Sequence, residues 1–229
     1  MKIGYLQKTS FIDYPGRISA IVFTQGCNFR CPYCHNPELV IPRLFTDPIP
    51  EEKVLDFLSR RTGKLDGVVI TGGEPTIHPD LPDFLMKIKS MGFKVKLDTN
   101  GTNPDMLREI IQERFVDYIA MDVKAPLDKY SLVACTKINQ QAIAQSIKLI
   151  IDAGCASEFR TTLARSLLQP ADVMRIGELI QGAALYVLQS FVPSKHVDNE
   201  FIHETNFSEE EIMHLIDGLS TLVDSCILR

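Results

Sequence analysis

Short runs of β-branched and apolar residues alternate with segments of helical spacing along most of the chain, and this alternation limits the fold more than any other feature. Strand-length runs predict six strands, at 18–24, 67–71, 93–98, 117–122, 158–163 and 184–189. Helices are predicted between and after them, at 51–60, 81–91, 104–114, 140–153, 170–181 and 208–225. Ser208 followed by Glu211 is a capping-box pattern at the start of the last helix.

This order of elements predicts a parallel sheet, because parallel neighbours need a crossover that a helix supplies. We expect an α/β fold, a partial (β/α)6 TIM-like barrel, while periodicity alone leaves open a doubly wound sheet with helices on both faces. No repeat or linker marks a boundary, so we expect a single domain at 1–229. It would have an extended lead-in at 1–17 that turns at 13–16, a barrel core at 18–193 and a helical tail at 194–229.

Composition excludes some classes of protein. The 229 residues are 45% hydrophobic, which suffices for a sizeable core. Acidic residues outnumber basic ones by 29 to 24, and no basic run exceeds the pair Arg60-Arg61, so we expect no nucleic-acid partner. No apolar run reaches the roughly 18 residues of a membrane helix. We expect a cytoplasmic protein without a membrane partner, and its six cysteines are too sparse for a disulfide scaffold.

Three of the cysteines are clustered, at Cys27, Cys31 and Cys34. Thiolates favour iron-sulfur clusters or zinc, and a cubane cluster normally takes four of them, so a set of three leaves one metal position open. A zinc site with His35 or a more distant histidine as fourth ligand is an open alternative. The cysteines outside the cluster are expected to be buried or inert thiols; these are Cys135, Cys155 and Cys226.

Four unusual segments follow predicted strands: the cysteine loop, Gly72-Gly73-Glu74-Pro75, residues 98–101 and residues 122–124. All four lie at carboxyl ends of strands, the edge where parallel α/β folds bind ligands, which indicates a single site. The glycine pair has a plain alternative as a tight turn. Asp122 and Lys124 also have a plain alternative, since they could form a structural ion pair. Asp98 ends an apolar strand, where a carboxylate is costly unless it is paired or bound to a cation.

The cysteine spacing, with Tyr33 before the last thiol, resembles the signature of radical S-adenosylmethionine enzymes. Residues 72–75 resemble their methionine-binding loop. The resemblance implies a partial barrel of the radical SAM type and one [4Fe-4S] cluster held by Cys27, Cys31 and Cys34, with S-adenosylmethionine chelating the fourth iron. It further implies reductive cleavage of S-adenosylmethionine to a 5'-deoxyadenosyl radical that abstracts a hydrogen atom.

Residues 8–16, 34–36, 98–101, 121–124 and 159–162 resemble glycyl-radical-enzyme activating enzymes. The chain is most similar to anaerobic ribonucleoside-triphosphate reductase activating proteins, from about residue 4 to 193. This implies a radical SAM oxidoreductase that takes a hydrogen from a backbone glycine of a glycyl radical enzyme, with flavodoxin or ferredoxin as electron donor. The alternatives are a radical SAM enzyme acting on a small molecule or another peptide, and a zinc-stabilised interaction module.

The resemblance also implies roles for single residues, with Tyr33 against the adenine ring. The methionyl part of the cofactor would lie near Asn36, Gly72, Gly73 and Glu74. Its carboxylate or ribose would lie near Lys124 and Arg160. A monovalent cation beside the carboxylate would be held by Asp98, Thr99 and Asp122.

Two departures from the family pattern are informative. Residues 189–193 resemble the last-strand motif but lack the histidine that some activases have there. Larger activases insert a module with further cysteines after the trio, whereas here no cysteine occurs from His35 to Gly72, so we expect one cluster only. The histidines of the tail are expected to be surface or packing residues; these are His196, His203 and His214.

Overall fold

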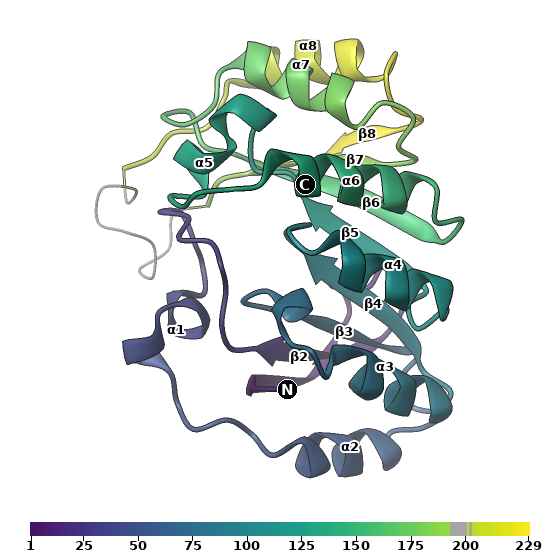
Figure 1. The fold of residues 1–229 in the computed structure, drawn as a ribbon. Coiled ribbons are helices and arrows are strands. Elements are labelled where there is room, and N and C mark those ends of the chain that lie inside the picture. The colour runs from purple at the N-terminus through teal and green to yellow at the C-terminus, as the bar shows by residue number, and fades with distance from the viewer. Residues whose placement is uncertain (193–200, 202) are drawn as a thin grey trace. The chain divides into compact units, whose positions relative to one another are not determined.

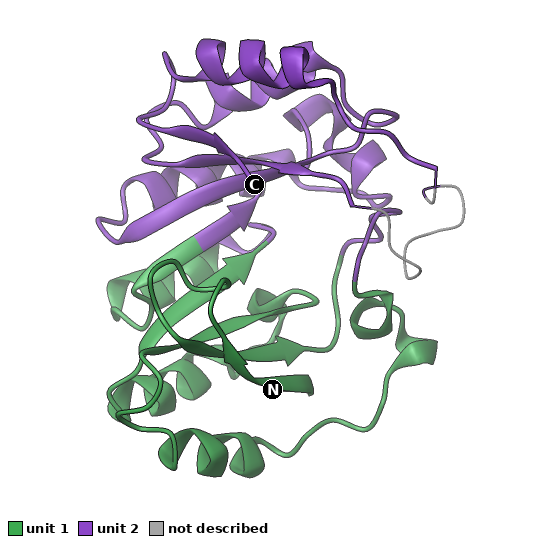
Figure 2. Ribbon diagram, turned by 180° about the vertical axis from the view of Figure 1, so that it is seen from behind, with its two compact units in different colours: residues 1–28, 36–99, 105–119 green, residues 29–35, 100–104, 120–229 purple. Residues whose placement is uncertain are grey.

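A computed structural model describes residues 1–192, 201 and 203–229. The described chain divides into two compact units (Figure 2). Unit 1 comprises residues 1–28, 36–99 and 105–119, and unit 2 comprises 29–35, 100–104 and 120–229. The expected single domain and its core and tail boundaries stay predictions, and Pro193 and His196 lie outside the described residues.

Unit 1 contains four strands that pair in chain order: β1 (Ile3–Ser10), β2 (Ser19–Thr24), β3 (Gly67–Gly72) and β4 (Lys94–Thr99). The pairs β2–β3 and β3–β4 are parallel, as predicted. Strand β1 runs antiparallel to β2, so the expected lead-in is itself part of the sheet. The helices of this unit are α1 (Pro37–Val40), α2 (Glu51–Ser59), α3 (Leu81–Ser90) and most of α4 (Pro104–Gln112), with 3-10 turns η1 (Pro42–Leu44) and η2 (Pro75–Ile77).

Unit 2 contains the parallel strands β6 (Ala156–Leu163), β7 (Tyr186–Ser190) and β8 (Cys226–Leu228). Its helices are η3 (Leu127–Lys129), α5 (Tyr130–Val133), α6 (Gln140–Ile151), α7 (Pro170–Leu179) and α8 (Glu209–Leu219). Strand β5 (Tyr118–Asp122) has its first two residues in unit 1 and its last three in unit 2. Helix α8 ends at Leu219, earlier than the predicted 225, and the chain then forms β8, which the sequence did not predict.

The strands follow one another in the order of the chain, from β1 to β8. A doubly wound sheet reverses its strand order at a switch point, and no such reversal occurs among the described strands. Parallel strands joined by helices without a reversal are the pattern of a partial βα barrel, so the predicted fold class is confirmed. No helix in the described part of the chain is long and apolar enough to cross a membrane.

Burial of the strands explains why these residues form a sheet covered by helices. Strand β2 carries the consecutive buried residues 19–22 and β3 the buried residues 67–70, a continuous pattern typical of parallel strands with both faces covered. In unit 2, α7 and α8 lie side by side (Figure 1), and Gly177 of α7 leaves room for Leu219 of α8. The predicted capping box is confirmed: Glu211 N donates to Ser208 Oγ at 3.2 Å, and Ser208 N donates to Glu211 Oε2 at 2.9 Å.

Candidate cofactor site

The cysteine loop follows β2 directly, and the division between the two units falls inside it. Cys27 belongs to unit 1, whereas Cys31 and Cys34 belong to unit 2. Chain length alone keeps the Cα atoms of Cys27 and Cys31 within about 14 Å of each other. All three cysteines are partly buried, and none of them forms a disulfide.

In unit 1 the glycine loop after β3 is hydrogen-bonded to the segment that leads into Cys27. Gly73 N donates to Thr24 O at 2.9 Å, and Glu74 N donates to Gly26 O at 2.8 Å. Gly72 has φ +110°, and a Cβ on Gly73 would lie 1.9 Å from Gly26 O. Both positions therefore require glycine, because one has a left-handed backbone and the other faces a backbone carbonyl.

The buried Glu74 side chain connects this loop to the end of β4. Its Oε1 accepts hydrogen bonds from Thr76 N at 3.1 Å, from Thr76 Oγ1 at 2.5 Å and from Thr99 Oγ1 at 2.8 Å. These donors belong to the protein, so Glu74 holds two strand-end segments in register. The predicted contact of Glu74 with a cofactor stays a prediction.

Asp98 of β4 is paired with a lysine of the same strand. Lys96 Nζ lies 2.6 Å from Asp98 Oδ1 and 5.8 Å from the centre of the Tyr118 ring. The Lys96 side chain is only 3% exposed. The sequence contained a signal for this pair, since residues two apart on a strand share one face.

In unit 2 the end of β5 carries an ion-pair network centred on Asp122. Arg160 Nε on β6 lies 2.7 Å from Asp122 Oδ1, and Lys124 Nζ lies 3.1 Å from Asp122 Oδ2. Burial by itself would raise the pKa of Asp122, but the charges of Arg160 and Lys124 outweigh it and hold this pKa far below its usual range. Burial by itself would lower the pKa of Lys124, and Asp122 reverses this, so Lys124 stays protonated. The ion pair that the sequence allowed is therefore present, with Arg160 as a third member.

Tyr130, at the start of α5, joins this network to the cysteine loop, and no sequence motif predicted it. Its hydroxyl accepts from Lys124 N and donates to Asp122 O, both at 3.2 Å. Its ring meets Phe29 edge to face at 6.1 Å, and Arg30 N donates to the carbonyl of the residue after α5 at 2.9 Å. One short helix thus supports both the loop residues 29–35 and the end of β5.

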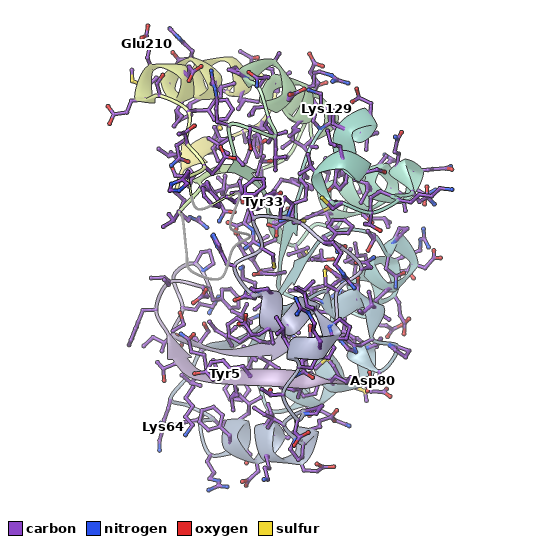
Figure 3. All side chains as sticks on the ribbon, turned by 90° about the vertical axis from the view of Figure 1, so that its left-hand side faces the viewer. Tyr5, Tyr33, Lys64, Asp80, Lys129 and Glu210 are labelled. Atoms are coloured by element: carbon purple, nitrogen blue, oxygen red, sulfur yellow. The ribbon has the colours of Figure 1, made fainter. Side chains whose placement is uncertain are left out.

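Tyr33 and His35 pack within unit 2 on either side of Cys34. Tyr33, labelled in Figure 3, is buried, with Lys124 Nζ 5.7 Å from its ring centre. The exposed His35 donates from Nε2 to Val192 O at 3.1 Å, and its ring lies 6.0 Å from that of Phe191. A nitrogen that donates to a carbonyl carries its proton, so Nε2 of His35 is not available as a zinc ligand here. A histidine therefore does lie beside the last-strand motif, although it comes from the cysteine loop.

The remaining predicted residues differ in exposure. Asn36 is partly buried at the start of α1 and makes no side-chain hydrogen bond to that helix. Cys226 is buried, as expected. Cys135 is exposed, so the expectation of a buried thiol does not hold at that position. His203 and His214 are exposed, as expected for surface residues.

The donor set fits an iron-sulfur cluster better than a hard metal ion. Thiolates are soft ligands, and burial raises the pKa of Cys31 to about 11, so the positive charge of a bound metal would favour the thiolate form of this cysteine. In the residues that the structure describes, no group of three or more His, Cys, Asp or Glu side chains is already assembled as a metal site. The three-cysteine ligand set and the cation ligands stay predictions.

Comparison with known proteins defines the class. The family model described as "Radical SAM superfamily" matches residues 21–168, a range that begins in β2 and ends after β6. The chain therefore belongs to the radical SAM superfamily, which implies a [4Fe-4S] cluster and S-adenosylmethionine as cofactors.

Relatives narrow the class to one kind of radical enzyme. A candidate glycyl-radical enzyme activating enzyme of Methanocaldococcus jannaschii is 33% identical over 96% of this chain and 92% of its own length. The pyruvate formate-lyase-activating enzyme of Clostridium pasteurianum is 32% identical over 54% of this chain and 52% of its own. Within the superfamily, the chain is thus a member of the glycyl-radical-enzyme activating enzymes.

Solved structures support the fold alone. SuiB of Streptococcus suis bound to S-adenosylmethionine has a TM-score of 0.71 at 10% identity, over 91% of this chain and 49% of that one. A domain of the pyruvate-formate lyase-activating enzyme of Bacteroides vulgatus has a TM-score of 0.57 at 18% identity, over 71% of this chain and 98% of that one.

Proposed function

We propose that this protein takes a hydrogen atom from a backbone glycine of a partner glycyl radical enzyme, with anaerobic ribonucleoside-triphosphate reductase as the expected partner. The observation that carries the proposal is the 33% identity to an activating enzyme over nearly the full length of both chains. A 7-carboxy-7-deazaguanine synthase of Aquifex aeolicus is 37% identical, but over only 38% of this chain and 38% of its own. The partner and a flavodoxin or ferredoxin donor rest on the sequence resemblance.

Cys27, Cys31 and Cys34 are the proposed cluster ligands. When bound, the reduced cluster supplies the electron that cleaves S-adenosylmethionine to methionine and a 5'-deoxyadenosyl radical, which abstracts the hydrogen. The chain supplies binding and orientation. The tight backbone contact of Gly73 with Gly26 supports a role of the glycine loop in fixing Cys27.

The remaining proposed contacts follow charge and shape. Lys124 and Arg160 are held in their cationic forms beside Asp122, which suits them to the carboxylate or the ribose hydroxyls of the cofactor. Gly72, Gly73 and Asn36 would lie near the methionyl part. Tyr33 is the proposed neighbour of adenine.

Electron paramagnetic resonance tests this proposal directly. The protein is reconstituted anaerobically with iron and sulfide, reduced, and mixed with S-adenosylmethionine and the anaerobic reductase. We expect a glycine-centred doublet and 5'-deoxyadenosine, and neither with Cys31→Ala. A reductase whose radical glycine is replaced by alanine is the matched control, in which the doublet should disappear.

Other results have distinct meanings. Cleavage of S-adenosylmethionine without a doublet would contradict the proposed partner and favour a small-molecule or other peptide substrate. A zinc-loaded protein that is silent in the resonance spectrum and does not cleave S-adenosylmethionine would contradict radical chemistry altogether.

A further inference from the structure

Lys96 is a buried ammonium placed at a carboxylate for which the sequence resemblance implied a metal cation. Lys96 Nζ lies 2.6 Å from Asp98 Oδ1, and its side chain is 3% exposed. A lysine so little exposed is uncommon unless it is paired, because burial removes the hydration of its charge. The pair therefore needs an explanation beyond chance surface contact.

The surroundings of Lys96 are apolar. In the parallel register Lys96 lies beside Val69 of β3, which in turn lies beside Ile21 of β2. Val69 and Ile21 are buried in one cluster with Tyr14, and Tyr118 packs against that cluster. The Tyr118 ring, 5.8 Å from Lys96 Nζ, offers the negative face of an aromatic ring to the ammonium. An apolar residue would fit this setting without the desolvation cost, so the charge itself is the notable feature.

Thr99, the other residue of unit 1 that was expected to bind the cation, also has a partner inside the protein. Thr99 Oγ1 donates to Glu74 Oε1 at 2.8 Å. A metal cation bound to Asp98 would share one carboxylate with the Lys96 ammonium, and the two positive charges would repel each other in a poorly solvated place. The residues at the end of β4 therefore do not fit a separate cation well.

We infer that the ammonium of Lys96 supplies the positive charge that was expected from a bound monovalent cation at Asp98. In this role Lys96 is a positioning residue: it neutralises Asp98, so that the end of β4 accepts a second carboxylate, that of the methionyl group. The inference rests on the proposed function for the identity of that carboxylate. The part of the inference that Lys96 takes the place of a metal cation at Asp98 does not rest on it.

Thermal unfolding in salts of different cations tests the inference. Wild-type protein, with and without S-adenosylmethionine, is melted anaerobically at constant ionic strength while choline chloride is replaced by KCl or NaCl. Choline is too large to be coordinated as a metal cation is. A cation at about ten times its dissociation constant would raise the midpoint by about 3 to 6 °C. We expect no such rise for the wild type.

Variants of Lys96 test whether a metal cation can take the place of the Lys96 ammonium beside Asp98. Lys96→Ala removes the ammonium and leaves space beside Asp98, so we expect a lower midpoint in choline and a rise of about 3 to 6 °C in K⁺ or Na⁺. Lys96→Met fills the space without a charge and should show no recovery. Lys94→Ala is the matched control, because Lys94 lies two residues earlier on the same strand but is 49% exposed and paired with Asp117.

Affinity for S-adenosylmethionine gives a second readout. By calorimetry the wild type should bind equally well in choline, K⁺ and Na⁺, whereas Lys96→Ala should bind more weakly in choline and recover in K⁺. A wild-type midpoint that rises with K⁺ would overturn the inference, whether or not a glycyl radical forms in the activation assay. Lys96→Ala without cation recovery would overturn it too, and would leave Lys96 and Asp98 as an ordinary structural pair. If Lys96→Ala does not fold, the comparison of wild-type midpoints in choline, K⁺ and Na⁺ salts still tests the inference.

Discussion

Replacing Gly73 with alanine should displace the backbone that leads into the first cysteine. The new Cβ would lie 1.9 Å from Gly26 O and 2.6 Å from Gly26 C, where ordinary contact begins at 3.4 Å. Gly26 must therefore move by about 1.5 Å, or Gly73 must move away by the same amount. Neither movement is free, because Gly26 N donates to Leu39 O at 2.7 Å and Gly26 O accepts from Glu74 N at 2.8 Å.

The cost follows from these contacts. Overpacking at a well-packed position costs about 1 to 3 kcal/mol, and one broken backbone hydrogen bond adds about 1 kcal/mol. The free energy of unfolding should fall by about 2 to 4 kcal/mol, which lowers the melting midpoint by roughly 5 to 15 °C for a chain of this size. Because Cys27 directly follows Gly26, we also expect loss of bound iron and of S-adenosylmethionine cleavage.

The assay compares this variant with a glycine substitution in open space. Gly154 has φ +66°, and a Cβ added there would meet no neighbouring atom within 4 Å. Gly154→Ala therefore costs only the strain of an alanine in left-handed backbone, about 1 to 2 kcal/mol. Its iron content and cleavage rate should match the wild type. If Gly73→Ala kept both the wild-type midpoint and the full iron content, the reasoning about the glycine loop would be refuted.

Further predictions concern the cluster, its support and pH. Iron and sulfide analysis should give about four irons per chain, and about eight would contradict a single cluster. Cys31→Ala should lose the cluster absorbance and cleavage, whereas Cys135→Ala should keep both, and retained cleavage in the first variant would refute the ligand assignment. Tyr130→Phe loses two hydrogen bonds to backbone atoms, so calorimetry should show weaker S-adenosylmethionine binding and urea unfolding a loss of about 1 to 3 kcal/mol, with iron content unchanged. Burial alone would raise the pKa of Asp117, but bonds from two lysines lower it, so this carboxylate stabilises the fold above its unfolded pKa of about 3.9 and less as pH falls through its folded pKa. Asp117→Asn should therefore destabilise the protein at pH 7, and unfolding curves that still differ as much at pH 3 would contradict this.

Periodicity predicted the elements that are long and buried. All six predicted strands and all six predicted helices exist, with ends within two residues of the predicted ones except for the last helix, which ends at Leu219 and not at 225. The pairing of β1 was missed because its sequence alternates poorly, with partly exposed residues along most of its length. Strand β8 has three residues, too short for any periodic pattern, and it exists because it pairs with β7.

The candidate site was predictable as a set of strand ends and less so as a set of contacts. Motif spacing placed the cysteines, the glycine pair and Asp122 correctly at the carboxyl ends of strands. It could not predict that Glu74 accepts three hydrogen bonds from protein donors, because the donors, Thr76 and Thr99, come from separate segments that only the fold brings together. Tyr130 was missed for a related reason. A single tyrosine in a helical segment is interpreted as an ordinary core residue, and the contacts of its hydroxyl depend on tertiary packing.

The support of the cysteine loop by α5 has a consequence for repair of the protein after exposure to oxygen. Phe29 against Tyr130 and the backbone hydrogen bond from Arg30 N hold residues 29–35 through contacts in which no cysteine side chain takes part. The conformational entropy of ordering Cys31 and Cys34 is thus lost during folding, so little of it opposes metal capture. A protein that has lost its iron to oxidation but remains folded should then rebuild its cluster faster than one refolded from denaturant, once the thiols are reduced again.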